Sequence, residues 1–279
     1  MGILNVTPDS FSDGGRHEDP GAALAQAQRM LEEGADIIDV GGESTRPGAQ
    51  PVDAPEQVRR VLPVIGALRD AVPGIIISID TTRARVAQAA LDVGASIIND
   101  VSAGRHDPQM FPLAASRSAP VVLMHMQGEP RTMQDNPSYG DVVKEVLEFL
   151  RQRVEAAVAQ GIGRSQLLID PGIGFGKTKE HNLQLLGGLE RFVATGHGVL
   201  LGTSRKRFMG ALCPGTRGIS GGGGGGQGEA PRPESLVGAT CATTALGVAA
   251  GVRVFRVHDV RPNRQAADVA WAISQWPTS

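Results

Sequence analysis

Short apolar runs alternate with amphipathic stretches along the whole chain, and this alternation leaves few folds open. We count eight runs predicted to be strands, each followed by a stretch with helical spacing. The runs are GILN, DIIDV, IIISID, SIINDV, PVVLMHM, QLLID, HGVLLGTS and VRVFRVHDV. They are rich in Ile, Val and Leu with little polar alternation, which is typical of parallel strands buried on both faces. A regular series of this number favours an α/β fold that closes as a (β/α)8 TIM barrel over an open doubly wound sheet.

Length and composition agree with one domain. The chain has 279 residues, of which 41% are hydrophobic, and single α/β barrels commonly have this size. We therefore predict a single barrel domain over residues 1–279. One segment breaks the series, because residues 218–233, GISGGGGGGQGEAPRP, have almost no apolar side chains to offset the entropy lost on ordering. We predict a flexible surface insertion there, between the seventh strand and its main helix.

The charge balance argues against nucleic-acid and membrane partners. Lys and Arg number 27, Asp and Glu number 29, and the net charge is −2, with no basic face and no polybasic block. No apolar run is long enough to span a bilayer, and the N-terminus lacks the charged-then-apolar order of a secretory signal. The two cysteines, Cys213 and Cys241, have no metal-ligand spacing and fit a reducing compartment. These features predict a cytoplasmic protein.

Nearly every predicted strand ends in a polar residue, followed by a loop that contains Gly or Pro. These residues are Asn5, Asp39, Asp80, Asn99, His125, Asp170, Ser204 and His258. In a (β/α)8 barrel the carboxyl ends of the strands form the catalytic mouth, so these polar groups are expected to converge on one cavity. The alternative is that strands simply stop at polar residues. The strand period of two also places Arg256 beside His258, and Ser78 beside Asp80.

The two sides of this mouth are expected to differ in charge. The segment GTSRKRF follows the seventh strand, where barrels commonly bind anions, and together with Arg256 and His258 it suits a phosphate or pyrophosphate. On the opposite side, Asp80, Asn99 and Asp170 suit either a metal ion or the N–H edge of a heterocycle. Both interpretations stay open from these residues alone.

Three loops rich in small and polar residues add to the mouth. DPGIGFGKT ends like a nucleotide-binding P-loop, but Pro171 removes an amide and fixes φ where that loop needs glycine. We interpret its glycines as positions where the backbone approaches a flat ligand, with Phe175 covering an aromatic ring; a purely structural turn is the alternative. The loops NVTPDSFSDGG and GGESTRPGAQP are long for a compact barrel and are predicted to be mobile covers that carry Asp13 and Arg46.

Eight motifs together resemble the dihydropteroate synthase family of folate biosynthesis. They are NVTPDSFSDGG, DVGGESTRPGA, SIDT, INDV, LMHMQG, DPGIGFGKT, SRK and RVHDV. The resemblance covers residues 1 to about 276 and is highly specific, because all eight occur in the family's order and spacing. It implies a transferase that joins p-aminobenzoate to 6-hydroxymethyl-7,8-dihydropterin pyrophosphate, forming 7,8-dihydropteroate and releasing pyrophosphate. It also implies Mg²⁺ as cofactor, a homodimer through barrel helices, and sulfonamides as mimics of the arylamine.

Carried over position by position, the resemblance implies several groups of site residues. The pterin pocket is Asp80, Asn99, Met124, Asp170 and Lys206. The pyrophosphate contacts are Asn5, Arg46, Arg256 and His258, with Asn5 as the Mg²⁺ ligand. The p-aminobenzoate side is Thr45, Arg46, Pro47, Phe175, Ser204 and Lys206, and Phe11 and Asp13 belong to the loop that closes over it. The expected catalytic residues are Asp80, Asp170, Lys206, Arg256 and His258.

The same residues suggest a dissociative, SN1-like path. Pyrophosphate departs from a methylene attached to an electron-rich pterin, so a stabilised cation is expected. Asp80 and Asp170 favour positive charge on the ring. Arg256, His258 and Mg²⁺ favour negative charge on the leaving group. The neutral arylamine is already nucleophilic, so no strong general base is required, and holding it near the methylene supplies much of the remaining acceleration.

Two other functions stay open. A pterin-binding methyltransferase barrel shares the fold and an acidic pterin pocket, but the STRPG and SRK loops and the lack of an appended corrinoid domain argue against it. A non-catalytic relative that binds pterin, or only packs in an oligomer, is the second. The chain departs from the family pattern in that Met1 already lies in the first strand, where members typically have a preceding segment, and in its longer glycine run.

Overall fold

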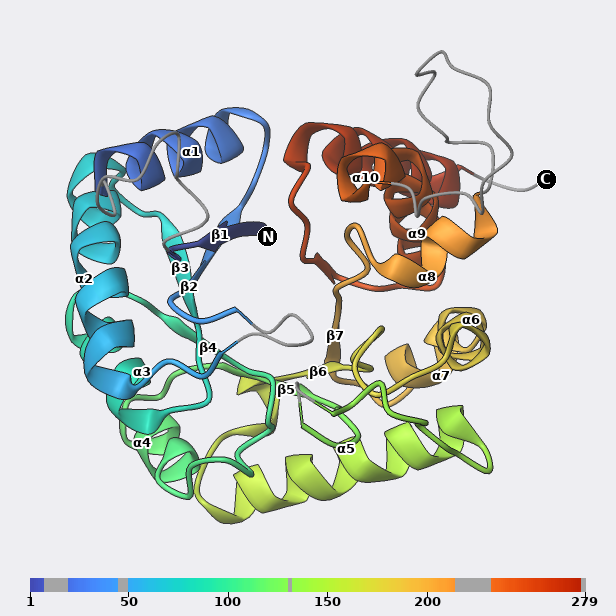
Figure 1. The fold of residues 1–279 in the computed structure, drawn as a ribbon, viewed down its shortest axis with the longest axis horizontal. Helices are drawn as coiled ribbons and strands as arrows, with labels where there is room; N and C mark the ends of the chain where they lie inside the picture. Colours follow the sequence, from blue (N-terminus) through green and yellow to red (C-terminus); the bar gives the residue numbers. More distant parts are fainter. Residues whose placement is uncertain (8–19, 45–49, 130–131, 214–231, 277–279) are drawn as a thin grey trace.

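The computed structural model describes residues 1–7, 20–44, 50–129, 132–213 and 232–276. Within them, eight strands alternate with helices that lie around the outside (Figure 1). The strands are β1 (Gly2–Asn5), β2 (Ile37–Gly41), β3 (Ile76–Asp80), β4 (Ile97–Asp100), β5 (Val121–Met124), β6 (Leu167–Asp170), β7 (Gly198–Leu201) and β8 (Val254–Phe255). The helices are α1 (Pro20–Glu32), α2 (Ala54–Ala71), α3 (Ala84–Asp92), α4 (Met110–Ser116), α5 (Val142–Ala159), α6 (Lys179–Gly187), α7 (Leu189–Val193), α8 (Arg207–Leu212), α9 (Val237–Ala249) and α10 (Val260–Gln275), with 3-10 turns η1 (Arg164–Gln166) and η2 (Pro233–Leu236).

The strands close into a barrel. Each pairs in parallel with the next in sequence, from β1 to β8. The last strand returns to the first through a parallel bridge between Gly2 and Val257. Two backbone hydrogen bonds of 3.0 Å support this bridge, from Ile3 N to Val257 O and from Val257 N to Met1 O. The predicted (β/α)8 barrel is therefore confirmed.

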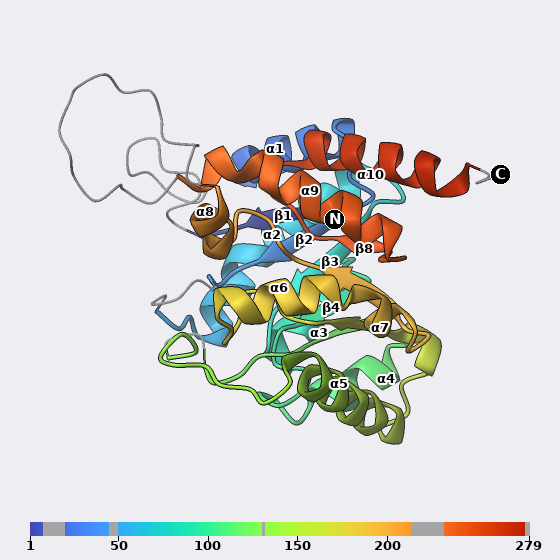
Figure 2. The same ribbon diagram turned by 90° about the vertical axis from the view of Figure 1, so that its right-hand side faces the viewer.

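The main core lies between the barrel and the helices. Alternate residues of β2 and β3 point away from the barrel interior, toward the surrounding helices. These residues are Ile38, Val40, Ile77 and Ile79, and all four are fully buried. Burying one such side chain contributes about 2 kcal/mol. In Figure 2, helices lie above and below the strands, with α1, α9 and α10 on one side and α4 and α5 on the other.

The opposite, inward face of the same strands is polar. Asp39, Ser78 and Asp80 occupy it, and all three are buried. Barrel interiors are commonly filled by bulky branched side chains. Carboxylates in that position add little to stability, so this part of the barrel indicates a functional cavity.

Strand ends agree with the predictions at three positions and differ at others. Asn5, Asp80 and Asp170 end β1, β3 and β6 as predicted. Asp39 was predicted as a strand end but lies in the middle of β2, because Val40 and Gly41 continue the pairing opposite β3. The strands β7 and β8 end at Leu201 and Phe255, so Ser204 and His258 stand on the following loops.

Two remaining predictions concern the insertion and membranes. Residues 218–231 of the predicted insertion lie outside the described residues, and Pro233, its predicted last residue, begins η2. The helices in the described part of the chain include none that is both long enough and apolar enough to cross a membrane.

Candidate functional site

Strand register brings four sequence-distant residues to one end of the barrel. Asn5 pairs with Gly41, Gly41 with Asp80, and Asp80 with Asn99, so these positions lie side by side across four strands. On the other side of the mouth, Met124 pairs with Asp170. The predicted convergence of polar strand ends is thus a consequence of parallel pairing.

A buried ion triplet joins opposite parts of this mouth. Arg256 follows β8 and donates from Nε to Asp39 Oδ2 at 2.6 Å and from Nη2 to Asp80 Oδ2 at 2.7 Å. Asn99 Nδ2 donates to the same Asp39 oxygen at 3.1 Å. The predicted separation of acidic and basic groups onto opposite sides is therefore wrong for Arg256. Barrel closure places β8 beside β1, and the long arginine side chain reaches across to β2 and β3.

Burial and pairing set the pKa values of these groups. Burial raises the pKa of Asp80, and the neighbouring Arg256 offsets part of that rise. Burial alone would lower the pKa of Arg256, but Asp39 and Asp80 together raise it above its ordinary value. The guanidinium is therefore permanently charged and is the counter-ion of both carboxylates.

The next group forms the wall on the β5 and β6 side. Lys206 Nζ lies 4.1 Å from the centroid of the Phe175 ring, a cation–π contact. Phe175 packs on a small apolar cluster formed by Val101, Met124, Met126 and Met133. Burial raises the pKa of Asp170 to about 6 and lowers that of Lys206 to about 8, and each charge partly offsets the shift of the other. The structure thus places Met124, Asp170, Phe175 and Lys206 together.

Two glycines of the DPGIGFGKT loop allow a close approach of backbone to backbone. Gly172 has φ +67°, and a Cβ there would lie 1.9 Å from the carbonyl oxygen of His125. A Cβ on Gly176, φ +62°, would lie 2.3 Å from the carbonyl oxygen of Gln127. Both contacts are with the loop after β5, so these glycines allow two loops of the mouth to pack backbone to backbone.

Lys177 strengthens the same junction and was missed in the sequence. Its Nζ is buried, lies 2.9 Å from His125 Nδ1 and donates to Phe175 O at 2.9 Å. Burial lowers the pKa of Lys177 to about 7 and that of His125 to about 2, so the imidazole is neutral beside the amine. The sequence pattern that marks Lys177 is a lysine after glycines in the loop that follows a buried strand. The same pattern resembles the end of a P-loop.

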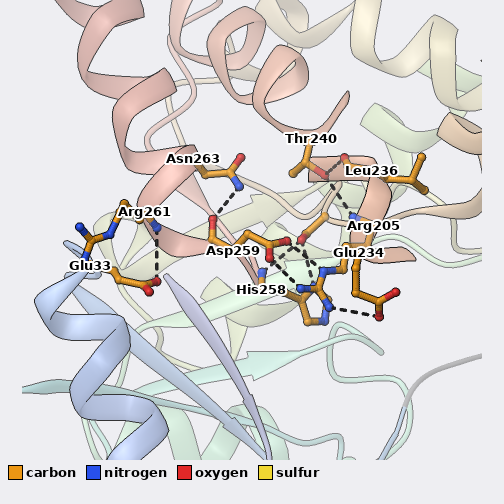
Figure 3. A network of polar contacts seen from close by, with 10 residues as sticks. Glu33, Arg205, Glu234, Leu236, Thr240, His258, Asp259, Arg261 and Asn263 are labelled. Carbon is orange, nitrogen blue, oxygen red and sulfur yellow. Dashed lines mark hydrogen bonds and ion pairs between the residues drawn. The ribbon is translucent and has the colours of Figure 1, made fainter. Parts of the chain in front are cut away.

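The loops after β7 and β8 also contact each other. Ser204 Oγ accepts from His258 N at 3.1 Å and lies 2.9 Å from His258 Nδ1. Arg205 pairs with Asp259 through two hydrogen bonds (Figure 3). The sequence predicted three cations of GTSRKRF facing an anion, but the charge of Arg205 is already matched by this carboxylate.

Five predicted site residues lie outside the described residues. These are Phe11, Asp13, Thr45, Arg46 and Pro47. Both flanks of the segment that carries Arg46 are held by Glu43, whose carboxylate accepts from Val52 N at 3.0 Å and from Gln57 Nε2 at 2.7 Å.

Oxygen atoms suitable for a magnesium ion lie next to Gly41. A Cβ on Gly41 would lie 3.6 Å from Asn5 Oδ1 and 3.7 Å from Asp80 Oδ2, so the absence of a side chain leaves room between two oxygen donors. Mg²⁺ prefers oxygen and takes many of its ligands from substrate phosphates. In the described part of the chain, no group of three or more His, Cys, Asp and Glu could hold a metal. The two oxygen donors beside Gly41 would fit a Mg²⁺ ion that takes its other ligands from a phosphate group.

Comparison with known proteins shows similarity over almost the full length. The model of a family described as "Pterin binding enzyme" matches residues 1–258. Dihydropteroate synthase of Synechocystis sp. is 43% identical over 273 residues, 98% of this chain and 89% of the relative. That of Mycobacterium leprae is 47% identical over 273 residues, 98% and 92% of the two chains.

Solved structures agree with these relatives. A Xanthomonas albilineans dihydropteroate synthase with 4-aminobenzoic acid superposes with a TM-score of 0.88 at 44% identity, covering 99% of this chain and 93% of that one. The same organism's enzyme in complex with 7,8-dihydropteroate gives 0.85 at 42%, covering 99% and 94%. A Yersinia pestis dihydropteroate synthase in a sulfonamide drug complex gives 0.88 at 40%, also covering 99% and 94%.

Gly172→Ala tests the close approach of the two loops. The new Cβ would meet the His125 carbonyl in a left-handed conformation, so we expect the free energy of unfolding to fall by about 3 kcal/mol or more. Denaturant unfolding followed by circular dichroism measures this change. The control is Gly66→Ala in α2, where a Cβ meets nothing within 4 Å and should add about 0.5–1 kcal/mol. Equal stability of the two variants would contradict the prediction.

Asp170→Asn tests the cost of the buried carboxylate. The pKa of Asp170 in the folded protein, about 6, exceeds its ordinary value of 3.8. The neutral carboxyl therefore contributes its full share to the unfolding free energy below about pH 4, and this contribution is lost as the pH rises through 6. The permanently neutral variant should therefore exceed the wild type in unfolding free energy by about 2 kcal/mol at about pH 8, and match it below about pH 4.

A control for Asp170→Asn is Asp268→Asn, which removes an exposed carboxylate paired with Arg264. We expect its unfolding free energy to stay within about 0.5 kcal/mol of the wild type at both pH values. An Asp170→Asn protein less stable than the wild type at the higher pH would refute the assignment of a burial cost.

Proposed function

The chain belongs to the dihydropteroate synthase family of pterin-binding enzymes, and we propose how its own residues condense p-aminobenzoate with 6-hydroxymethyl-7,8-dihydropterin pyrophosphate. Members of this family are transferases of folate biosynthesis. The observation that carries the proposal is the TM-score of 0.88, at 44% identity over 99% of this chain, to an enzyme with bound 4-aminobenzoic acid. The constellation of Asp80, Asn99, Asp170 and Lys206 at the barrel mouth supports it.

The pterin binds between the acidic strand ends and the Met124–Phe175 wall. Asp170 and Asn99 present acceptors and an amide to the N–H edge of the heterocycle, and the apolar wall packs on its face. Asp80 lies on the same inward side and is held in place by Arg256. Lys206 joins this pocket to the p-aminobenzoate side, because it contacts Phe175 and lies two residues after Ser204.

The leaving diphosphate binds near the ends of β1 and β8. Arg256 and His258 offer a guanidinium and an imidazole, and Arg46 from the loop after β2 joins them. Asn5 would hold Mg²⁺, which when bound neutralises part of the diphosphate charge. The family resemblance assigns loop closure to Phe11 and Asp13 and p-aminobenzoate binding to Thr45, Arg46 and Pro47, all of which lie outside the described residues.

Electrostatics favours the dissociative path. The carbon–oxygen bond to pyrophosphate breaks, positive charge spreads over the pterin, and the arylamine nitrogen then bonds to the methylene and loses one proton. Burial disfavours the ionised form of Asp170, and Lys206 offsets only part of that cost. A cationic transition state adds positive charge beside the carboxylate, so the carboxylate binds the transition state more tightly than the neutral substrate.

Pyrophosphate release tests the reaction. The protein is mixed with the pterin pyrophosphate and Mg²⁺, and release is followed with and without p-aminobenzoate. Release only in its presence is expected, and sulfonamides should suppress it competitively. Neither the methyltransferase nor the non-catalytic alternative produces p-aminobenzoate-dependent release.

Asp170→Asn separates chemistry from diphosphate binding. We expect turnover to fall by about 10²-fold or more, because a carboxylate next to the developing cation is lost. Pyrophosphate affinity, measured by calorimetry, should change by less than about threefold, since Arg256 and His258 remain. Equal losses of turnover and affinity would contradict this mechanism, and Asp268→Asn serves as the control for both measurements.

We further propose that two copies associate through α9 and α10. These helices pack side by side (Figure 2) and leave Leu246, Val269, Trp271 and Ile273 largely exposed, with Trp276 just beyond the last turn. Val269, Ile273 and Trp276 are spaced by four and three residues, so they lie on one side of α10. An apolar face of this kind on one pair of helices is typical of a protein–protein interface.

Ile273→Asp tests the homodimer. A buried, unpaired charge should shift the protein from dimer to monomer in sedimentation velocity. Leu183→Asp replaces an exposed leucine on α6 instead, and that variant should remain dimeric. A wild-type monomer, or a dimer that tolerates Ile273→Asp, would rule out this interface.

We also propose that the enzyme works in the cytoplasm. With two cysteines in 279 residues the chain has no basis for a framework of several disulfides, which fits a reducing compartment.

A further inference from the structure

A fork-shaped ion pair ties the loop after β7 to the loop after β8. Arg205 donates from Nε to Asp259 Oδ2 at 2.9 Å and from Nη2 to Asp259 Oδ1 at 2.7 Å (Figure 3). Two parallel charge-assisted bonds fix the relative orientation of the partners as well as their distance. About a quarter of the Arg205 side chain and a fifth of that of Asp259 are exposed, so the pair is largely shielded from solvent.

The backbone at Arg205 is held in an unfavourable conformation. Its φ is +57°, in the left-handed region that long side chains rarely adopt. The surroundings hold it there, since Arg205 N donates to Thr240 Oγ1 at 3.2 Å and that hydroxyl donates to Leu236 O at 3.0 Å (Figure 3). Strain of this kind persists where neighbouring structure over-determines it and concentrates at functional sites.

Asp259 is anchored from the other side. Its carbonyl accepts from Asn263 Nδ2 at 2.8 Å, and Asn263 Oδ1 accepts from Thr244 Oγ1 at 2.7 Å. This chain of bonds connects the Asp259 backbone to α10 and α9. Glu234 on η2 lies farther from the guanidinium, 3.8 Å from Nη1, and is the weaker partner.

Arg205 and Asp259 are both sequence neighbours of residues of the proposed site. Arg205 stands between Ser204 and Lys206, and Asp259 follows His258 directly. Ser204 Oγ accepts from His258 N and contacts His258 Nδ1, so the two loops also meet at the site itself. A shift of the Arg205–Asp259 pair would therefore move groups of the p-aminobenzoate side relative to the diphosphate side.

We propose that Arg205 and Asp259 are positioning residues, which touch no substrate and hold Ser204 and Lys206 in register with His258. The inference rests on the proposed function of those three residues. The proposal also gives the strained backbone at Arg205 a role. The turn there directs Ser204 toward His258 and Lys206 toward Phe175.

The test is a double-mutant cycle with Arg205→Lys, Asp259→Asn and the double variant. Lysine keeps the charge and the Cβ but lacks the fork, and asparagine keeps the shape but lacks the charge. Each single variant should lower kcat/KM for p-aminobenzoate by about tenfold or more, because small misplacements of reacting groups are costly. The double variant should lie within about twofold of the worse single, because both act through one interaction.

Arg205→Asn separates positioning from folding. Asparagine tolerates a left-handed backbone, so the strain is relieved as the ion pair is lost, and the melting temperature should stay within a few degrees of the wild type. Activity should nevertheless fall as in Arg205→Lys. The weaker pyrophosphate binding expected from a displaced His258 is measured by calorimetry on the same proteins.

A matched control pair lies far from the mouth on α5. Arg151 donates to Glu148 with the same fork, Nε to Oε2 at 3.0 Å and Nη2 to Oε1 at 2.7 Å. Arg151→Lys and Glu148→Gln should leave kcat, KM and pyrophosphate affinity unchanged. The proposal is overturned if Arg205→Lys keeps full activity, if the two single effects multiply, or if activity falls only in proportion to lost folded protein. A wild-type protein that forms no product would instead refute the proposed function.

Discussion

The ion triplet of Asp39, Arg256 and Asp80 is the interaction on which the barrel interior depends. One guanidinium from the last strand neutralises one of two carboxylates that stand on adjacent strands within the barrel. Removing charges from water is costly, and only good geometry and further hydrogen bonds offset that cost. Asp39 Oδ1 and the neighbouring Ser78 Oγ are nevertheless buried without a hydrogen-bond partner among the described residues. Such an interior is poor for stability, so its polar groups are better explained by binding and catalysis.

The same conflict between burial and charge extends to the rest of the mouth. Burial raises the pKa of Asp170 and lowers the pKa values of Lys206 and Lys177, because each charged group is held largely away from water. Under the proposed function, positive charge that develops on the pterin ring would stabilise the ionised carboxylate, and a diphosphate would stabilise nearby cations. The free-energy cost of burying these charged groups is therefore incurred when the protein folds, and the reaction needs little further reorganisation of the site.

The sequence is sufficient to predict the barrel and three of its polar strand ends, but not the long-range side-chain pairs. Strand periodicity and polar strand ends predicted Asn5, Asp80 and Asp170 correctly, because these depend on local pattern and parallel register. The bond from Arg256 to Asp39 joins residues 217 positions apart and depends on side-chain length and barrel closure. The close contact of Gly172 with a neighbouring loop likewise depends on tertiary packing, which cannot be deduced from residue spacing along the chain.

The loops of the mouth form two rigid pairs, and Lys206 connects them. The loops after β5 and β6 are joined by Gly172, Gly176 and Lys177, whereas those after β7 and β8 are joined by the Arg205–Asp259 fork. Lys206 belongs to the second pair, yet its amine rests on the Phe175 ring of the first. Its position is consequently fixed by both pairs at once, and a movement of either pair would change the distance between the proposed pterin wall and the proposed p-aminobenzoate side. A residue constrained in this way can serve two substrates, because the scaffold that holds one also sets the place of the other.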